Sequence, residues 1–396
     1  MVDFSASVKA MRSSAIRELL NTAVRPDIIS FAGGMPNPSL FPIDEVDEIY
    51  RSLTVEQKQT GFQYGPTGGY PPLVEAIKAY LQKKGLPLEG NEVIITTGSL
   101  QAINIMSKIF IDPGDTVICE DPSFTGAVTV FLSYQANLVG VPLDADGMIL
   151  DDFDRILDKT QKVKFVYITP NFHNPAGIIY SRERRLALLQ RLQAKDLVLL
   201  EDDPYNELYF DPADCAVTTP LKTLGKEQTP ICYTGSLSKI FGPGMRIGYL
   251  LAPKEIINKA ELAKQSMDAC TSTFTQVLAC EFFRQGKLEP YLNRLRQAYK
   301  HRADIMLAAL QQHMPADVRW NTPKGGFYVW VEMPEHIDAN QVLKTSLAKG
   351  AIFVVGKAFD PLGQRNHFIR LSFSHMPEAK ISRGVEIVAQ AIGETL

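Results

Sequence analysis

Short apolar runs rich in β-branched residues alternate with runs of helical periodicity through the middle of the chain. The apolar runs include EVIITTG at 92–98, TVICE at 116–120, FVYIT at 165–169 and LVLLED at 197–202. Stretches such as SLQAINIMSKIFI and SFTGAVTVFLSY lie between them, and a charged helix is expected to begin near Ser181. Near-continuous apolar strands separated by helices are typical of a parallel sheet that is covered on both faces. The sequence therefore predicts an α/β domain.

Longer helices follow from about residue 254. In residues 288–314 Leu288, Leu292, Leu295 and Tyr299 recur at helical spacing, and the later runs GFYVWVEM, AIFVVG and FIRLSFS are typical of strands. This change predicts a second, smaller α+β domain. Because we find no internal repeat, low-complexity tract or long linker, we expect the two domains to pack closely.

Composition excludes several classes of function. The 396 residues carry 41 basic and 44 acidic side chains, a formal charge of -3, with no block of like charges that would bind nucleic acid. No apolar run approaches the ~18 residues that span a membrane, and MVDFSASVKAMRSS lacks the apolar region of a signal peptide, so we expect a cytoplasmic protein. Five scattered cysteines without a C-x-x-C pair argue against disulfides and against a zinc site, and we expect no metal.

Polar residues collect where the expected strands end. They are Gly98, Ser99, Asn174, Asp202, Tyr205, Ser236, Ser238, Lys239 and Arg246. Each alone has an ordinary structural interpretation as a helix cap, a turn residue or a solvated lysine. Ligands of an α/β sheet bind at the carboxyl ends of its strands, so the set together predicts a site for an aromatic cofactor with a phosphate.

Eight segments in order resemble one enzyme family. They are SAIRELL, ISFAGGMPNPSLFP, FQYGPTGGYPPL, ITTGSLQA, NPAG, EDDPY, SLSKIFGPGMRIGYL and IRLSFS. The chain resembles the class I and II aminotransferases of the aspartate aminotransferase superfamily, which are fold type I enzymes with pyridoxal 5'-phosphate (PLP). Within it, the chain looks most like the branch of the 2-aminoadipate and kynurenine aminotransferases. The resemblance implies a large domain with a mostly parallel seven-stranded sheet at 44–285, a small α+β domain at 286–396, and an N-terminal arm at 1–43 that joins the small domain.

The resemblance also implies the roles of the residues that hold the cofactor. Lys239 would form the Schiff base and move the proton during catalysis, and Asp202 would keep the pyridine nitrogen protonated. Tyr205 and Asn174 would hydrogen-bond the phenolic oxygen, and Phe124, where many relatives have Tyr, would stack on the ring. The phosphate would be held by a set of donors that comprises Arg246, Ser236, Ser238, the N–H groups of Ser99 and Leu100, and Tyr64 from the partner in a homodimer. Relatives often have Gln where Leu100 stands, which leaves only its main-chain contact.

Substrate recognition is implied for other residues. Arg370 would pair with the α-carboxylate, beside Asn174, and Gly34 would let the N-terminal arm pass close to the substrate. Arg17 would read the distal carboxylate of a dicarboxylic amino acid, although it is equally typical of the polar face of a helix. We interpret His173 as structural. The predicted reaction is a ping-pong transfer of nitrogen from an amino acid to a 2-oxo acid such as 2-oxoglutarate, with 2-aminoadipate, glutamate, aromatic or branched-chain amino acids as candidate donors.

Three alternatives compete with this interpretation. SLSK is formally an S-x-x-K motif, with Ser236 as nucleophile and Lys239 as base, but YLN at 291–293 falls in a predicted helix and KGG at 324–326 lacks the hydroxyl of K-[TS]-G. A PLP-binding transcriptional regulator would carry a winged-helix module ahead of this part, and since the resemblance begins by Arg17 we expect none. A β-lyase, decarboxylase or racemase would use the same lysine and arginine, and motifs alone leave it open.

Overall fold

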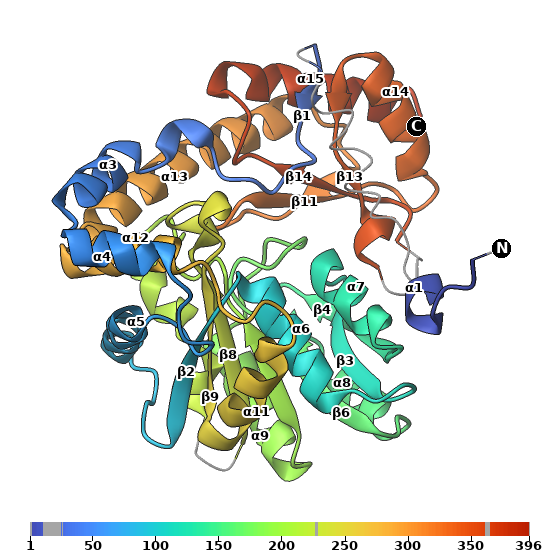
Figure 1. The fold of residues 1–396 in the computed structure, drawn as a ribbon. Helices are drawn as coiled ribbons and strands as arrows, with labels where there is room; N and C mark the ends of the chain where they lie inside the picture. Colours follow the sequence, from blue (N-terminus) through green and yellow to red (C-terminus); the bar gives the residue numbers. More distant parts are fainter. Residues whose placement is uncertain (1, 11–24, 26, 226–228, 361–364, 396) are drawn as a thin grey trace.

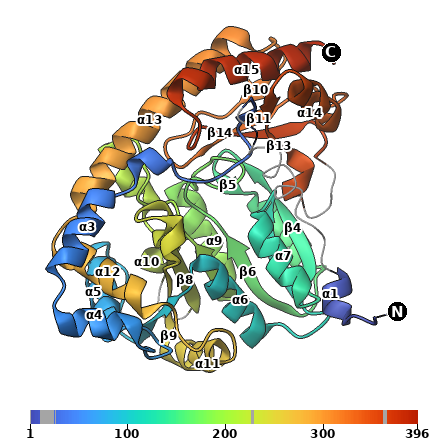
Figure 2. The ribbon, with the colours of Figure 1, turned by 45° about the horizontal axis from the view of Figure 1, so that its top comes forward.

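The structure is a computed structural model that describes residues 2–10, 25, 27–225, 229–360 and 365–395. Figures 1 and 2 show a large α/β unit with a smaller unit stacked on one end of its sheet. The long helix α13 (Leu288–His313) runs from the large unit into the small one. This arrangement agrees with the predicted fold class.

The central sheet has eight strands within the described residues, in the order β2-β9-β8-β7-β6-β3-β4-β5. In that order they span Asn91–Thr96, Gly248–Pro253, Ile231–Ser236, Val198–Asp202, Val163–Ile168, Thr116–Asp121, Asn137–Asp144 and Gly147–Met148. Strands β9 and β5 run against the others, so the sheet is mostly parallel as predicted. The eighth strand, beyond the seven expected, is the two-residue β5, which folds back on the end of β4 in a hairpin.

Helices cover both faces of this sheet. Adjacent residues such as Leu199 and Leu200 are both fully buried, and successive side chains of a strand point to opposite faces. Helices α6 (Ser99–Phe110), α7 (Thr125–Ser133) and α11 (Lys254–Gln265) share an apolar cluster with one face. The other face packs against α8, α9 and α10, which span Leu150–Leu157, Arg182–Ala194 and Leu221–Leu224.

A further group of helices lies beside the β2 edge. The group comprises α3 (Ile43–Ser52), α4 (Val55–Phe62), α5 (Pro71–Lys83) and α12 (Thr273–Arg284). Helix α12 contacts the other three, and α5 contacts β2 (Figure 1). Helix α4 begins at a capping box, in which Thr54 and Gln57 bond each other's backbone N–H.

The small unit joins the two ends of the chain. Its four-stranded antiparallel sheet has the order β10-β11-β14-β13, with strands Arg319–Trp320, Tyr328–Glu332, Phe368–Ser372 and Val354–Val355. Near the N-terminus β1 (Ile29–Ser30) pairs in parallel with β12 (Ala351–Ile352). Helices α14 (Ala339–Ala348) and α15 (Glu378–Gly393) complete the unit, and α15 packs on α13. A short helix, α1 (Ala6–Ala10), lies against α7 of the large unit.

One predicted strand is divided. The run AIFVVG forms β12 and then β13, because its first residues pair with β1 and its later residues pair with β14. The domain limits 44–285 and 286–396 stay predictions.

Within the described ranges every helix is too short or too polar to cross a membrane. The cytoplasmic location expected from the sequence stays a prediction.

Candidate active site

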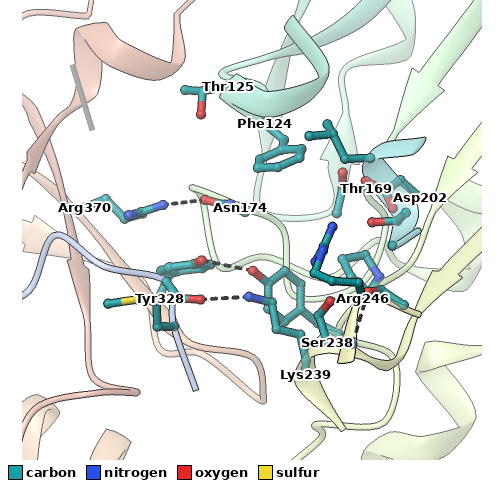
Figure 3. A pocket seen from close by; sticks show the side chains of 18 residues that line it. Phe124, Thr125, Thr169, Asn174, Asp202, Ser238, Lys239, Arg246, Tyr328 and Arg370 are labelled. Atoms are coloured by element: carbon teal, nitrogen blue, oxygen red, sulfur yellow. Dashed lines mark hydrogen bonds between the residues drawn. The ribbon is translucent and has the colours of Figure 1, made fainter. Parts of the chain in front are cut away.

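A pocket of about 390 Å³ opens between the end of the central sheet and the small unit. Its lining consists of Gly34, Met35, Gly98, Ser99, Leu100, Phe124, Thr125, Thr169, Asn174, Asp202, Pro204, Tyr205, Ser236, Ser238, Lys239, Arg246, Tyr328 and Arg370. Figure 3 shows Arg370 and Asn174 on one side of the pocket, with Asp202 and Arg246 on the other side of the view.

Strand ends place the large-unit residues of the pocket. Ser99 begins α6 after β2, Phe124 precedes α7 after β3, and Thr169 follows β6. Asp202 is the last residue of β7 and Ser236 the last of β8. These strands run in the same direction, so their carboxyl ends meet at one edge of the sheet, as the sequence predicts.

One end of the pocket suits an anion. The N–H groups of Ser99 and Leu100 open α6, where unpaired N–H groups and the helix dipole favour negative charge. Arg246 holds a left-handed backbone conformation with φ 54°, and its Nη2 donates to the carbonyl oxygen of Thr97 at 3.0 Å. A Cβ atom on Gly98 would lie 2.8 Å from that Nη2, so the approach of the guanidinium depends on glycine.

The two serines complete this end. Ser236 Oγ accepts a hydrogen bond from the backbone N–H of Ser238 at 3.2 Å, which closes a tight turn between β8 and Lys239. Both serines line the pocket with Arg246. A fixed positive charge with hydroxyl and N–H donors around it is the donor set that a phosphate needs.

Lys239 extends from the same turn into the pocket. Its Nζ donates to the carbonyl oxygen of Gly34 at 2.8 Å and lies 5.7 Å from the ring centre of Tyr205. Loss of water around the amine, followed by the positive charges of Arg370 and Arg246, lowers its pKa to about 8. A substantial fraction of this lysine is therefore neutral near pH 8 and able to act as a nucleophile or a base.

Asp202 is a carboxylate held away from water, with 1% of its surface exposed. Tyr167 donates its hydroxyl to Oδ2 at 2.9 Å, whereas Oδ1 has no hydrogen-bond partner among the described residues. Burial raises the pKa of Asp202 to about 7, although the Tyr167 hydrogen bond opposes that rise. A buried oxygen without a donor at the pocket wall fits a protonated ring nitrogen.

Arg370 is a buried cation on β14. Its Nη1 donates to Asn174 Oδ1 at 2.8 Å and its Nη2 to the carbonyl oxygen of Ala32 at 2.5 Å. Within the described part of the chain these bonds go to neutral oxygens, and Nε has no partner. Burial lowers the pKa of Arg370. A desolvated guanidinium without a carboxylate partner is a site for a carboxylate ligand.

Aromatic side chains shape the remaining walls. The hydroxyls of Tyr205 and Tyr328 lie 2.9 Å apart, and the guanidinium of Arg370 lies 4.3 Å from the ring centre of Tyr328. A Cβ atom on Gly126 would lie 2.5 Å from the ring of Phe124, so this glycine lets the phenyl ring lie close against the start of α7. The pocket can therefore hold a planar ring between an aromatic face and polar edges.

Four lining residues escaped the sequence analysis for a common reason. Thr125, Thr169, Pro204 and Met35 stand in or beside motifs that were noticed, but their own residue types carry no chemical signal. Tyr328 was missed because it stands inside a predicted strand, where alternation does not say which side chains meet a ligand. Only the topology, which pairs β11 with β14, brings Tyr328 beside Arg370.

Two predicted site residues are not part of the pocket lining. Tyr64 lies on the surface of the chain, with 86% of the residue exposed, and its predicted role at a partner's site stays a prediction. Arg17 lies outside the described residues. His173 is fully buried behind the site, where Nδ1 accepts from the N–H of Ala176 and Nε2 lies 3.1 Å from Glu120. These contacts agree with a structural role for His173.

The S-x-x-K alternative lacks its central contact. Ser236 Oγ bonds the backbone of Ser238, and Lys239 Nζ bonds the backbone of Gly34, so neither hydrogen bond joins the serine to the lysine. A serine nucleophile needs its base within hydrogen-bonding reach. The geometry does not favour a serine hydrolase.

Comparisons with known proteins agree with the geometry. Residues 37–388 match the family described as aminotransferase class I and II. Aromatic-amino-acid aminotransferase 1 of Thermococcus litoralis is 37% identical over 398 residues, which cover 99% of this chain and 94% of that protein.

Solved structures are similar along the whole chain. The kynurenine aminotransferase of Pyrococcus horikoshii, in complex with PMP, has a TM-score of 0.95 at 37% identity, with 99% of this chain and 97% of that chain covered. The α-aminoadipate aminotransferase of Thermus thermophilus, complexed with N-(5'-phosphopyridoxyl)-L-leucine, has a TM-score of 0.89 at 34% identity, with the same coverage of 99% and 97%.

Proposed function

The chain belongs to the aminotransferase class I and II family, and on that premise we propose how its pocket carries out PLP-dependent transamination. The enzyme moves the amino group of an amino acid to a 2-oxo acid. When bound, PLP supplies a conjugated ring that accepts the electron pair of the Cα–H bond.

The observation that carries the proposal is the pairing of Asp202 with Lys239 in one pocket. Asp202 offers a buried oxygen without a donor, and Lys239 offers an amine whose pKa is lowered to about 8. We assign the ring nitrogen to Asp202, whose carboxylate would keep it protonated, and the covalent link to Lys239. The Lys239 amine would also serve as the base that takes the proton from the substrate Cα and as the acid that gives it back.

The phosphate is assigned to the anion-binding end of the pocket. Arg246 supplies the fixed charge, Ser236 and Ser238 supply hydroxyls, and the N–H groups of Ser99 and Leu100 supply the helix terminus. Tyr205 and Asn174 are assigned to the phenolic oxygen, and Phe124 to the ring face. Contacts to the phosphate, to the phenolic oxygen and to the ring nitrogen would together fix the orientation of the ring and hold the reacting carbon beside Lys239.

Arg370 is assigned to the substrate α-carboxylate. It is buried, and the described part of the chain offers it only neutral oxygens. The N–H groups of its guanidinium, Nε among them, would pair with the carboxylate, and this pairing would orient the Cα–H bond toward Lys239.

The preference for the side chain of the substrate is a finer question. We propose a dicarboxylic amino donor whose distal carboxylate is bound by Arg17, with 2-oxoglutarate as acceptor. Aromatic donors are the second candidate, in view of the relatives named above.

We further propose that the enzyme is a homodimer. Phe62 and Tyr64 are 81% and 86% exposed, and an apolar groove of about 520 Å³ lies between α3 and the loop at Pro243–Met245. A second copy on this surface would bury the groove. The partner's Tyr64 would then reach the phosphate end beside Arg246, whose side chain is open to solvent.

Borohydride reduction tests the cofactor assignment. Reduction of the holoenzyme should fix a phosphopyridoxyl group on Lys239, located by peptide mass mapping. Lys222 is the internal control, because burial lowers its pKa to about 8 as well, yet its Nζ bonds Asn91 and the carbonyl oxygen of Ile231 instead of facing the pocket. Label on Lys222, or on no lysine, would contradict the assignment.

A donor panel tests the reaction and its specificity. Amino acids are supplied with 2-oxoglutarate and the glutamate formed is measured. Failure of every donor would overturn 2-oxoglutarate as acceptor. If Arg17→Ala leaves the preference for acidic over aromatic donors unchanged, the dicarboxylate assignment is wrong.

Mixed dimers test the shared site. Variants Tyr64→Ala and Lys239→Ala are each inactive if both residues are required. A mixed dimer would place both lesions in one site and leave the other intact, so activity should return when the two variants are unfolded and refolded together. Mixing that restores nothing would place Tyr64 outside the partner's site.

A further inference from the structure

Tyr328 is a buried tyrosine whose hydroxyl lies in the site without an assigned role. It stands on β11, with 2% of its surface exposed, and its Oη lies 2.9 Å from the Oη of Tyr205. Figure 3 shows Tyr328 beside Lys239. The strand neighbour Phe327 packs edge-on against the Tyr205 ring, with ring centres 5.4 Å apart. The pair therefore has little freedom to separate.

The surroundings hold the Tyr328 hydroxyl in place. A Cβ atom on Gly34 would overlap Tyr328 Oη, so the backbone of the N-terminal arm lies directly against it. The ring itself lies under the guanidinium of Arg370, at 4.3 Å from its centre to the guanidinium carbon. Gly34 also accepts the hydrogen bond of Lys239. The hydroxyl is thus clamped between the arm and Tyr205.

The direction of the hydrogen bond between the hydroxyls of Tyr205 and Tyr328 decides whether Tyr205 can donate to a ligand. Each hydroxyl has one proton, and only one of the two can donate across their hydrogen bond. If Tyr205 donates to Tyr328, it turns its lone pairs toward the pocket. If Tyr328 donates to Tyr205, the proton of Tyr205 is free to point at a ligand. Burial raises the pKa of Tyr205, so Tyr205 keeps a proton to donate.

We propose that Tyr328 is a positioning residue that donates its hydroxyl proton to Tyr205, so that Tyr205 donates to the phenolic oxygen of PLP. This inference rests on the proposed function. An anionic oxygen facing Tyr205 selects this direction, because the opposite direction would set lone pairs against negative charge. Hydrogen bonds in a chain polarise one another, so the bond from Tyr328 strengthens the one from Tyr205 to the cofactor.

A purely structural role for the ring is the competing explanation. The ring supports Arg370 and packs near Tyr205, and its loss would disturb both residues. Tyr328→Phe separates the two explanations, since it keeps the ring and removes only the hydroxyl. Tyr299→Phe is the matched control: Tyr299 is also buried and its ring lies 4.7 Å from that of Phe327, but its hydroxyl accepts from the N–H of Asn37 at 3.3 Å.

The test is a pH titration of the visible absorbance of the holoenzyme. Its midpoint reports the proton shared between the phenolic oxygen and the nitrogen of Lys239. With one donor fewer at the phenolic oxygen that proton is held more tightly, so Tyr205→Phe should raise the midpoint. Tyr328→Phe should raise it by a smaller step, roughly half a pH unit, and Tyr299→Phe should leave it unchanged. In the Tyr205→Phe background, removal of the Tyr328 hydroxyl should add nothing.

Two results would overturn the inference. One is a Tyr328→Phe midpoint equal to that of the wild type, and the other is a full additional shift in the double variant. Gly34→Ala provides a second route, since the added methyl group displaces Tyr328 Oη while residue 328 remains a tyrosine, and it should shift the midpoint in the same direction. A wild-type protein that forms no cofactor band would refute the proposed function and this inference with it, whereas a normal band without these shifts refutes this inference alone.

Discussion

Replacing Asp202 by Asn should stabilise the cofactor-free protein while it disables the enzyme. Burial raises the pKa of Asp202 from 3.8 to about 7. A group whose pKa is higher in the folded state contributes stability below its unfolded pKa, and that stability is lost as the pH rises through the folded pKa. Asn carries no charge, so Asp202→Asn escapes this loss. The gain from the substitution should therefore be larger at pH 8 than at pH 5.

The magnitude follows from the pKa. Two pH units separate pH 5 from a pKa of about 7, and each is worth about 1.4 kcal/mol, so the gain should grow by roughly 3 kcal/mol between pH 5 and pH 8. Changes in packing do not depend on pH over this range and cancel in the difference, and the effect of the Tyr167 hydrogen bond is already contained in the pKa. The measurement is the free energy of urea unfolding of the apoenzyme, wild type and variant, at the two pH values.

Asp268→Asn is the control for this experiment. Burial acts to raise the pKa of Asp268, but hydrogen bonds from Lys264, Gln101 and Thr97 outweigh it and the pKa is lowered. Asp268 is thus ionised in both folded and unfolded chains at pH 5 and pH 8, and its substitution should have the same effect at both. If Asp202→Asn changes the free energy of unfolding by the same amount at pH 5 and at pH 8, the pKa of Asp202 is not raised by burial and the reasoning is wrong. In the holoenzyme the same variant should lose turnover, because the ring nitrogen loses its anionic partner.

Further predictions concern the two arginines and the carboxylate behind the site. Arg370→Lys should lower kcat/KM for every amino donor by roughly 100-fold, since a lysine cannot form the bidentate pair; an unchanged kcat/KM in steady-state assays would remove Arg370 from the α-carboxylate. Arg246→Lys should raise the Kd of PLP by roughly 10- to 100-fold, measured by equilibrium dialysis, and unaltered affinity would place the phosphate elsewhere. Glu120 accepts from the Tyr180 hydroxyl at 2.8 Å and from the N–H of Thr169 at 2.9 Å, so Glu120→Gln should cost roughly 2 kcal/mol of unfolding free energy; denaturation midpoints equal to wild type would argue that this buried network contributes nothing.

Much of the large-unit half of the site could be predicted because it depends on local order along the chain. Ser99, Asp202 and Ser236 each stand where an apolar run ends, and the carboxyl ends of parallel strands lie at one edge of a sheet. The residue types then indicated the chemistry, since a lysine, a carboxylate and an arginine at such an edge suit a phosphorylated aromatic ring. Lys239, Asp202 and Arg246, which supply these groups, all line the pocket.

The small-unit half could not be derived in this way. Arg370 bonds Asn174 across 196 positions of sequence, and it was named from the resemblance alone. Tyr328 was not named at all, because a strand pattern does not tell which of its buried side chains meets a ligand. The divided strand at 351–355 shows the same limit, since its break depends on two different partner strands.

The sequence by itself determined the kinds of groups at the site and the order, along the chain, of the strands that carry them. The tertiary structure decided their chemical state. It removed water from Asp202 and surrounded Lys239 with the charges of Arg370 and Arg246, which moves both pKa values toward neutrality. It also left Arg370 without a carboxylate among the described residues, and joined the hydroxyls of Tyr205 and Tyr328. These properties depend on access to water and on distances between atoms far apart in the chain, and only folding sets either of them.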